Sequence, residues 1–206
     1  MIHHSRFLVR SVDEDEWKRV RETGVSATTV AKAATPSGYA EIINERNNPT
    51  EFVDNGYMKF GRDNEAWIVA SLKDDYGIFA NDWLIAADGL ANRWMFATPD
   101  GLSLDHETIA EVKTTGKDWG EAKSIPIHYR RQVQWQLFVT GASRCIFGWV
   151  LRNEIAGQFV PAWFEPKIVV MERDEKMIAD LVQTAQTLQQ ELIHMEQYKQ
   201  EGKNNV

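Results

Sequence analysis

The sequence has 206 residues, of which 43% are hydrophobic and 26% are charged, which is typical of a globular protein and excludes a disordered or fibrous chain. Its single cysteine, Cys145, excludes an intrachain disulfide, and neither a signal-peptide core nor a membrane-spanning apolar run is visible. The net charge of −7 argues against a general nucleic-acid coat, but a basic strip between Lys113 and Arg131 could still hold a phosphate backbone locally.

The first part of the chain is predicted to be helical. Acidic residues 13–16 open a first helix that reaches Arg21, where they complement the helix dipole. A second short helix follows Gly24, with Ser26 or Thr28 as its N-cap, and a third covers residues 36–48. Residues 1–50 are therefore expected to form a small N-terminal helical region.

A mixed α/β core is predicted next. A helix over residues 60–77 has apolar residues on one face, and it precedes three consecutive strands over residues 77–90, 93–100 and 107–115. These strands are expected to form an antiparallel meander. A helix over residues 126–141 and strands over residues 143–152 and 158–171 complete a central mixed sheet flanked by helices, within a single domain whose core spans residues 60–170.

The last helix, over residues 173–200, has apolar residues at alternating steps of three and four. They are Ile178, Leu181, Ala185, Leu188, Leu192 and Met195. This seam is expected to pack on the protein's own sheet, and a partner helix is the alternative.

One stretch carries candidate chemistry. Asp100 lies in a Pro-Asp-Gly turn, and Glu111, Val112 and Lys113 follow on the next predicted strand. Side chains two residues apart on a strand project to one face, so Glu111 and Lys113 share a face that Asp100 can approach. Carboxylate and carbonyl oxygens are the ligands that Mg²⁺ prefers, which makes Asp100, Glu111 and the Val112 carbonyl candidate metal ligands. A hairpin with a solvated polar face is the alternative explanation.

Residues on neighbouring helices fit the same site. Glu65 precedes the strands and is positioned to reach the metal, while Tyr129 and Gln132 lie three residues apart on one helical face. Gln134 and Gln136 are expected on other sides of that helix. Trp119, among lysines, either stacks on an unpaired base or covers the loop that contains it.

The chain resembles the YqaJ-like viral recombinase, or lambda exonuclease, family within the PD-(D/E)xK nuclease superfamily. The matching stretches are WKRVRETGVSAT, FGRDNE, TPDGL, AEVK, YRRQVQWQLFVTG and VVMERDEK. The resemblance implies that Asp100 and Glu111 bind Mg²⁺, that Lys113 acts on the attacking water, and that Glu65 and Gln132 also lie in the active site. It further implies a grip on the DNA 5′-phosphate by Arg21 and Thr28 or Ser26, with Arg19 as the competing arginine and Tyr129 near the DNA.

The implied function is a metal-dependent 5′–3′ exodeoxyribonuclease that digests one strand of linear duplex DNA and leaves a 3′ overhang. Mg²⁺, which Mn²⁺ could replace, would be bound as two ions. A single-strand annealing protein, a homotrimeric assembly and a cytoplasmic location in a bacterial host cell are expected with it. A structure-specific endonuclease of the same fold and a non-catalytic DNA-end-binding protein are the alternatives.

Overall fold

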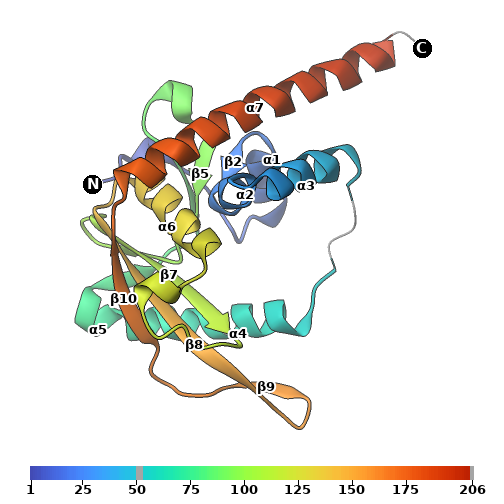
Figure 1. The fold of residues 1–206 in the computed structure, drawn as a ribbon. Coiled ribbons are helices and arrows are strands. Elements are labelled where there is room, and N and C mark those ends of the chain that lie inside the picture. The colour runs from blue at the N-terminus through green and yellow to red at the C-terminus, as the bar shows by residue number, and fades with distance from the viewer. Residues whose placement is uncertain (50–52, 205–206) are drawn as a thin grey trace.

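The computed structural model describes residues 1–49 and 53–204, which form a mixed α/β fold (Figure 1). The strands are β1 (Phe7–Arg10), β2 (Val25–Ser26), β3 (Ile78–Ala80), β4 (Trp83–Ala86), β5 (Met95–Ala97), β6 (Gly101–Ser103), β7 (Thr108–Thr115), β8 (Arg144–Ile155), β9 (Gln158–Pro161) and β10 (Lys167–Glu172). The α-helices are α1 (Glu14–Glu22), α2 (Ala27–Ala33), α3 (Pro36–Asn47), α4 (Gly56–Ser71), α5 (Lys73–Tyr76), α6 (Ile127–Thr140) and α7 (Glu175–Asn204).

The larger sheet has the strand order β10–β8–β7–β6–β3, and β9 extends it by pairing with β8. β7 lies in the middle of this sheet, antiparallel to β6 and parallel to β8. Parallel neighbours need a long crossover, and α6 provides it between β7 and β8. A second sheet, with the order β1–β4–β5–β2, lies beside the first. The predicted mixed sheet flanked by helices is therefore confirmed.

Two details of the predicted sheet are wrong. The expected strand over residues 77–90 divides into β3 and β4, which belong to different sheets. Asn81 causes the break, because its side-chain amide donates hydrogen bonds to the backbone carbonyls of Trp83 and Pro99. The expected meander is also wrong. β4 and β5 pair as expected, but they belong to the smaller sheet, and the strand that pairs with β7 in the larger sheet is β6.

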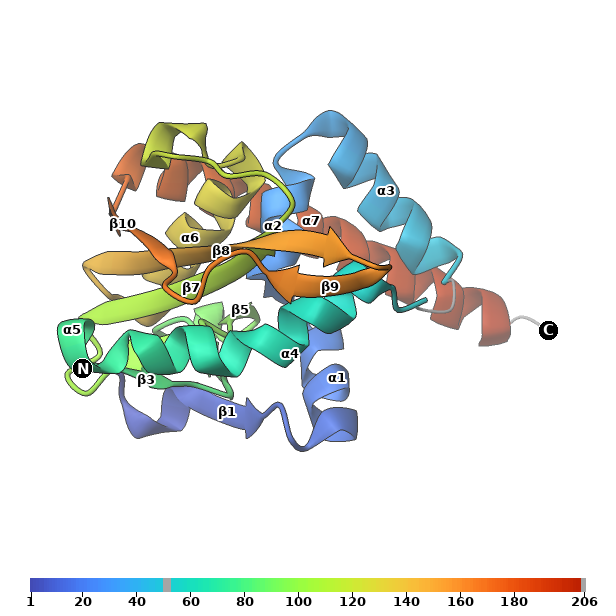
Figure 2. The ribbon, with the colours of Figure 1, turned by 90° about the horizontal axis from the view of Figure 1, so that it is seen from below.

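Two helices cover opposite faces of the larger sheet, as Figure 2 shows for α4 and α6. Side chains alternate along β7. Ala110 and Val112 therefore pack in one apolar cluster with Ile68 of α4, whereas Ile109 belongs to the cluster that contains Val133 of α6. Glu111 and Lys113 have the same parity as Ile109, so they face α6.

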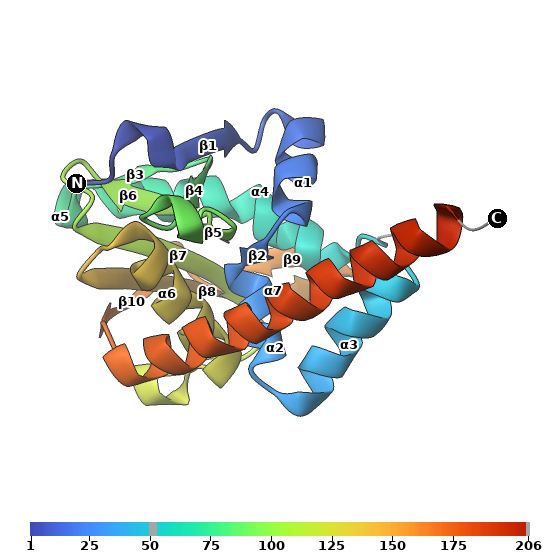
Figure 3. The same cartoon turned by 90° about the horizontal axis from the view of Figure 1, so that it is seen from above.

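α7 crosses the top of the molecule over α2 (Figure 3). Its apolar seam, from Ile178 to Leu192, is buried, and the helix contacts α6 and α2. The expectation that this seam packs within the protein is thus met, but on helices rather than on the sheet. Within the described part of the chain, none of the helices has the length and apolar character needed to cross a membrane.

Candidate active site

The site is built around β7, the central strand of the larger sheet. Asp100 directly precedes β6, and its Oδ2 atom accepts a hydrogen bond of 2.7 Å from the backbone N–H of Val112. Gly101, the next residue, lets β6 pack closely between its neighbours, because a Cβ atom there would lie 2.5 Å from a methyl carbon of Ile78 on β3 and 3.3 Å from the Cβ atom of Ala110 on β7. The bond ties Asp100 to β7 between Glu111 and Lys113, as the sequence pattern predicts.

The carboxylate of Glu111 is buried and accepts hydrogen bonds from three side chains. Its side chain is only 1% exposed. Its Oε1 atom accepts hydrogen bonds from Lys113 Nζ and, at 2.6 Å, from Gln132 Nε2, while Oε2 accepts one of 2.6 Å from Gln136 Nε2. A buried carboxylate is stable only with such partners, so both oxygen atoms of Glu111 are fixed in direction.

Gln136 is the residue that the sequence analysis missed. It was expected on another side of α6 from Gln132, but residues four apart share a helical face, and the structure places both amides on Glu111. The i,i+4 spacing was the available signal. Gln134, by contrast, has a structural role, because its side chain bonds the backbone of Glu172 and Asp174.

Lys113 lies between the two carboxylates and Tyr129. Its side chain is 21% exposed, and its Nζ atom lies 5.5 Å from the centre of the Tyr129 ring. Burial by itself lowers the pKa of Lys113, but the charges of Glu111 and Asp100 outweigh it and raise the pKa above its usual range. Lys113 is therefore a fixed ammonium group, able to donate hydrogen bonds but not to accept a proton.

The surroundings of Asp100 disfavour its charged form, whereas those of Lys113 favour the charged form. Burial, and then the negative charge of Glu111, raise its pKa well above the usual value of an aspartic acid. Burial followed by the charge of Glu111 also raises the pKa of Glu65, against the effect of Lys113. Carboxylates crowded in this way repel one another, and a divalent cation would relieve the repulsion.

The donor set fits a hard cation. Asp100 and Glu111 supply carboxylate oxygens, and Val112 supplies a backbone carbonyl between Glu111 and Lys113, which is the chemistry that Mg²⁺ prefers. Among the described residues, Asp100 uses only Oδ2 in a hydrogen bond, so Oδ1 is left for another partner. Within residues 1–49 and 53–204, no three Asp, Glu, His or Cys side chains form a cluster suited to a metal ion, so Glu65 does not complete a three-carboxylate cluster with Asp100 and Glu111.

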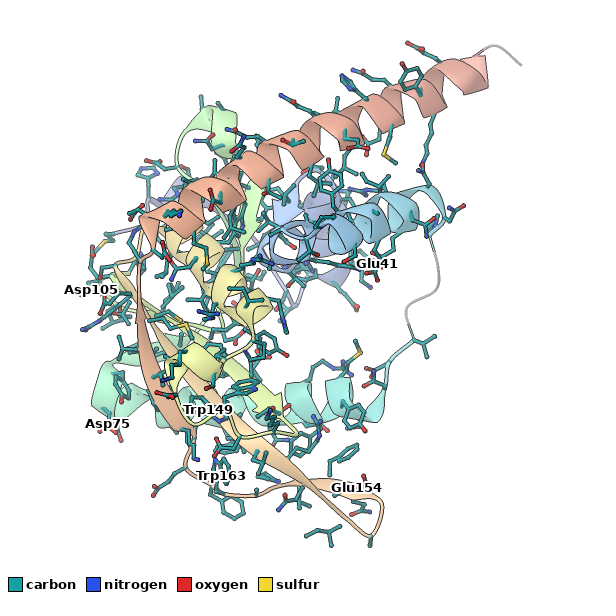
Figure 4. The ribbon with its side chains drawn as sticks, in the orientation of Figure 1. Glu41, Asp75, Asp105, Trp149, Glu154 and Trp163 are labelled. Atoms are coloured by element: carbon teal, nitrogen blue, oxygen red, sulfur yellow. The ribbon has the colours of Figure 1, made fainter. Side chains whose placement is uncertain are left out.

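Val112 and Lys113 line a cavity of about 480 Å³, which we call the catalytic cavity, and the buried Glu111 lies between Lys113 and Gln132 at its wall. Glu65 lines it from α4, Lys113 from β7, and Tyr129 and Gln132 from α6. Glu65 therefore lines the same cavity as Lys113 from the opposite side, and its contact with a metal stays a prediction. Trp119 does not reach it: its ring packs on Tyr129, Phe147 and Trp149, so it covers the loop. Trp149, one of these partners, lies on β8 and is labelled in Figure 4.

A second cavity, of about 740 Å³, lies between α1, α2 and α3, and we call it the end cavity. Arg21, Ser26 and Thr28 line it. Arg21 donates a hydrogen bond of 3.2 Å to the Ser26 hydroxyl, and its guanidinium lies 4.2 Å from the centre of the Trp17 ring. Ser26 also caps α2 by accepting from the Thr29 N–H. The structure thus brings Arg21 and Ser26 together.

The structure distinguishes Arg21 from its competitor. Arg19 is exposed and pairs with Glu16 at 2.6 Å, whereas Arg21 has no carboxylate partner among the described residues and lines the end cavity. Burial lowers the pKa of Arg21, so an anion in the end cavity would stabilise its charge. Thr28 lines both cavities, which are therefore neighbours.

The fold and this arrangement of residues define the chain as a nuclease of the PD-(D/E)xK type. Residues 16–143 match the model of the YqaJ-like viral recombinase domain, and the chain belongs to that family. It is similar to the alkaline exonuclease LHK-Exo from Laribacter hongkongensis, with 25% identity, a TM-score of 0.69, and coverage of 93% of this chain and 100% of that chain.

A structure of LHK-Exo in complex with dAMP gives the same identity and coverage at a TM-score of 0.68. A phage-related exonuclease from Haemophilus somnus 129PT shares the fold, with 15% identity, a TM-score of 0.64, and coverage of 84% of this chain and 96% of that chain. No curated protein matches the sequence.

Proposed function

We propose that this chain is a Mg²⁺-dependent exodeoxyribonuclease that hydrolyses one strand of linear duplex DNA from its 5′ end and leaves a 3′ overhang. One observation carries the proposal: Thr28 lines both the catalytic cavity, which Lys113 and Glu65 also line, and the end cavity of Arg21 and Ser26. A strand whose 5′-phosphate lies beside Arg21 can then present a nearby phosphodiester to Lys113. This arrangement favours cleavage at ends over cleavage within a duplex.

The residues of the chain have separate roles in this proposal. Asp100, Glu111 and the Val112 carbonyl would hold the metal, which we propose binds as two ions. When bound, it would neutralise the scissile phosphate and make water more acidic. Lys113 donates hydrogen bonds to the attacking water or to a phosphate oxygen. Gln132 and Gln136 keep the Glu111 carboxylate in one orientation. Glu65 and Tyr129 line the cavity and would lie beside the DNA strand that is cut.

The proposal extends to the assembly and setting of the enzyme. The N-terminal helical region, residues 1–50, would bind the DNA end, and residues 60–170 would form the catalytic core of one nuclease domain. The 3′ overhang is the substrate of a single-strand annealing protein, which we infer to be the partner. We further propose a homotrimer that acts in the cytoplasm of a bacterial host, with Mn²⁺ able to replace Mg²⁺.

The experiment that tests the proposal is digestion of linear duplex DNA labelled separately at each 5′ and 3′ end, with Mg²⁺ or with EDTA. We expect Mg²⁺-dependent loss of the 5′ label, retention of the 3′ label until late, and no cleavage of a covalently closed circle. A cut circle would instead identify an endonuclease of the same fold. Binding to DNA ends without any cleavage would identify a non-catalytic end-binding protein.

Arg21→Gln is expected to abolish the preference for a 5′-phosphate. A hydrogen-bonded charge contributes about 1.5–3 kcal/mol, so the ratio of initial rates on 5′-phosphorylated and 5′-hydroxyl duplexes should fall by roughly tenfold toward one. Arg19→Gln is the matched control, because Arg19 lies on the same helix and pairs with Glu16 at the surface. If Arg21→Gln keeps the wild-type rate ratio, or if Arg19→Gln loses the preference for a 5′-phosphate, Arg21 is not the residue that binds the 5′-phosphate.

A further inference from the structure

A group of aromatic rings and one arginine lies where the hairpin formed by β8 and β9 packs against the first turns of α4. The Arg152 guanidinium lies 4.2 Å from the centre of the Tyr57 ring and 5.4 Å from that of Phe159. The Tyr57 and Phe159 rings are 5.0 Å apart and inclined by 34°. We call Tyr57, Arg152 and Phe159 the hairpin platform.

The hairpin platform is pre-organised by close packing between the hairpin and α4. Phe60, itself buried, meets the Phe159 ring edge-on at 6.2 Å. A Cβ atom at Gly56 would lie 3.0 Å from the Phe159 ring, and one at Gly116 would lie 3.2 Å from Arg152 Nη2. Because these contacts already order the rings, a ligand that stacks on them pays little further conformational entropy.

The hairpin platform offers an open aromatic surface rather than a strongly positive one. Tyr57 is 54% exposed although Arg152 covers part of its ring. Glu154 lies opposite Phe159 in the β8–β9 ladder, and Figure 4 labels it on the hairpin. Arg62, on the neighbouring turn of α4, is neutralised by Asp54. This combination suits a base that stacks better than it suits a phosphate.

The hairpin platform lies next in the chain to residues that line the catalytic cavity. Met58, the residue after Tyr57, lines the catalytic cavity together with Gly61, Arg62 and Thr114. Thr28 lines the same cavity and also opens onto the end cavity. Figure 1 shows α1–α3, α4 and the β9 hairpin in succession along one side of the molecule.

We propose that the hairpin platform binds an unpaired base of the retained strand, the strand that is not degraded; this inference rests on the proposed exonuclease function. The two cavities hold the strand that is being cut. Stacking on Tyr57 needs a free base face, which a base inside a duplex does not offer. Removal of the 5′-ended strand unpairs the retained strand beside the catalytic cavity, and its first unpaired bases are then free to stack.

The test is binding, measured by fluorescence anisotropy in EDTA, to a duplex with a 3′ overhang. In a second duplex, abasic residues replace the first unpaired nucleotides of the overhang, which removes the bases and keeps the phosphates. In a third, abasic residues occupy the 5′-ended strand instead. The proteins are wild type, Tyr57→Ala and Tyr57→Phe, with Tyr198→Ala as matched control, because Tyr198 is a 75% exposed tyrosine on α7.

We expect Tyr57→Ala to bind the intact overhang duplex roughly five- to tenfold more weakly than wild type, a loss at the lower end for one stacked base. Abasic residues in the overhang should weaken wild type by the same factor and leave Tyr57→Ala unchanged. Tyr57→Phe and Tyr198→Ala should bind as wild type does.

Equal binding by wild type and Tyr57→Ala would overturn the proposal and favour a protein partner at the hairpin platform. The proposal would also be overturned if Tyr57→Ala lost further affinity on the duplex with an abasic overhang, because Tyr57 and those bases would then contribute to binding independently. Sensitivity only to abasic residues in the 5′-ended strand would show that the degraded strand occupies the platform. Digestion in Mg²⁺ is followed in parallel, so failure of the exonuclease function is read from wild type and is separate from failure of the platform.

Discussion

Lys113→Ala is expected to reduce hydrolysis of linear duplex DNA by about 10²- to 10³-fold, which is the usual loss when one fixed donor to a developing charge is removed. The Lys113 ammonium is held by Glu111 and kept protonated by the two carboxylates, so it is oriented before the substrate arrives. Alanine removes this donor and leaves the backbone of β7 unchanged. The measurement is the initial rate of 5′-label release in Mg²⁺.

Lys117→Ala is the matched control for this result. Lys117 follows the same strand, but it is exposed and does not line the catalytic cavity. Thermal unfolding of Lys113→Ala is measured alongside: loss of the ammonium group should lower the melting temperature, but the variant should stay folded at the assay temperature, because Gln132 and Gln136 still donate to Glu111. Near-normal turnover by Lys113→Ala, with Lys117→Ala unaffected, would refute the role assigned to Lys113.

Gln136→Leu is expected to raise the Mg²⁺ concentration needed for half-maximal cleavage by about 10- to 100-fold, the usual effect of removing a partner that orients a metal ligand. Gln136 is 1% exposed, and its amide gives Glu111 Oε2 its hydrogen bond. Its own Oε1 atom has no partner in the described part of the protein. Leucine therefore fills a similar volume and orphans no other donor, while the Glu111 carboxylate loses its orientation.

Gln134→Leu separates this effect from general destabilisation. Gln134 lies on the same helix and is 5% exposed, but it bonds the backbone of Glu172 and Asp174. Its replacement should lower the melting temperature and leave the Mg²⁺ dependence unchanged. If both variants show the wild-type Mg²⁺ dependence, Gln136 does not act through the metal site, and its hydrogen bond to Glu111 is structural only.

The elements with strong local signals are those that the sequence predicts well. α6 follows from its apolar positions and from the glycine at residue 141, which ends it with φ +81°. α1 follows from its acidic first turn, and Ser26 is confirmed as the N-cap of α2. β3 and β4 were not separated, because the Asn81 bonds that divide them involve Pro99, which is distant in the chain.

In the site, too, some residues can be identified from local sequence signals and others only from the tertiary structure. Asp100, Glu111 and Lys113 can be found from a turn and an alternating strand, and their convergence needs only one hydrogen bond to Val112. Gln136 and the distinction between Arg21 and Arg19 depend on which faces of helices meet other elements. Spacing alone leaves such faces undetermined, because a helix has several faces and packing selects the one that is buried.

The sequence by itself determined the helix and strand types around the site, the acid–acid–lysine set, and the family to which the chain belongs. These features depend on local periodicity and on the order of short motifs, both of which can be read directly from the sequence. The tertiary structure alone decided that β7 and β8 are parallel, that Glu111 has a second amide donor, and that Thr28 lines two neighbouring cavities. Each of these depends on contacts between residues far apart in the chain, where burial and the pairing of polar groups outweigh local preference.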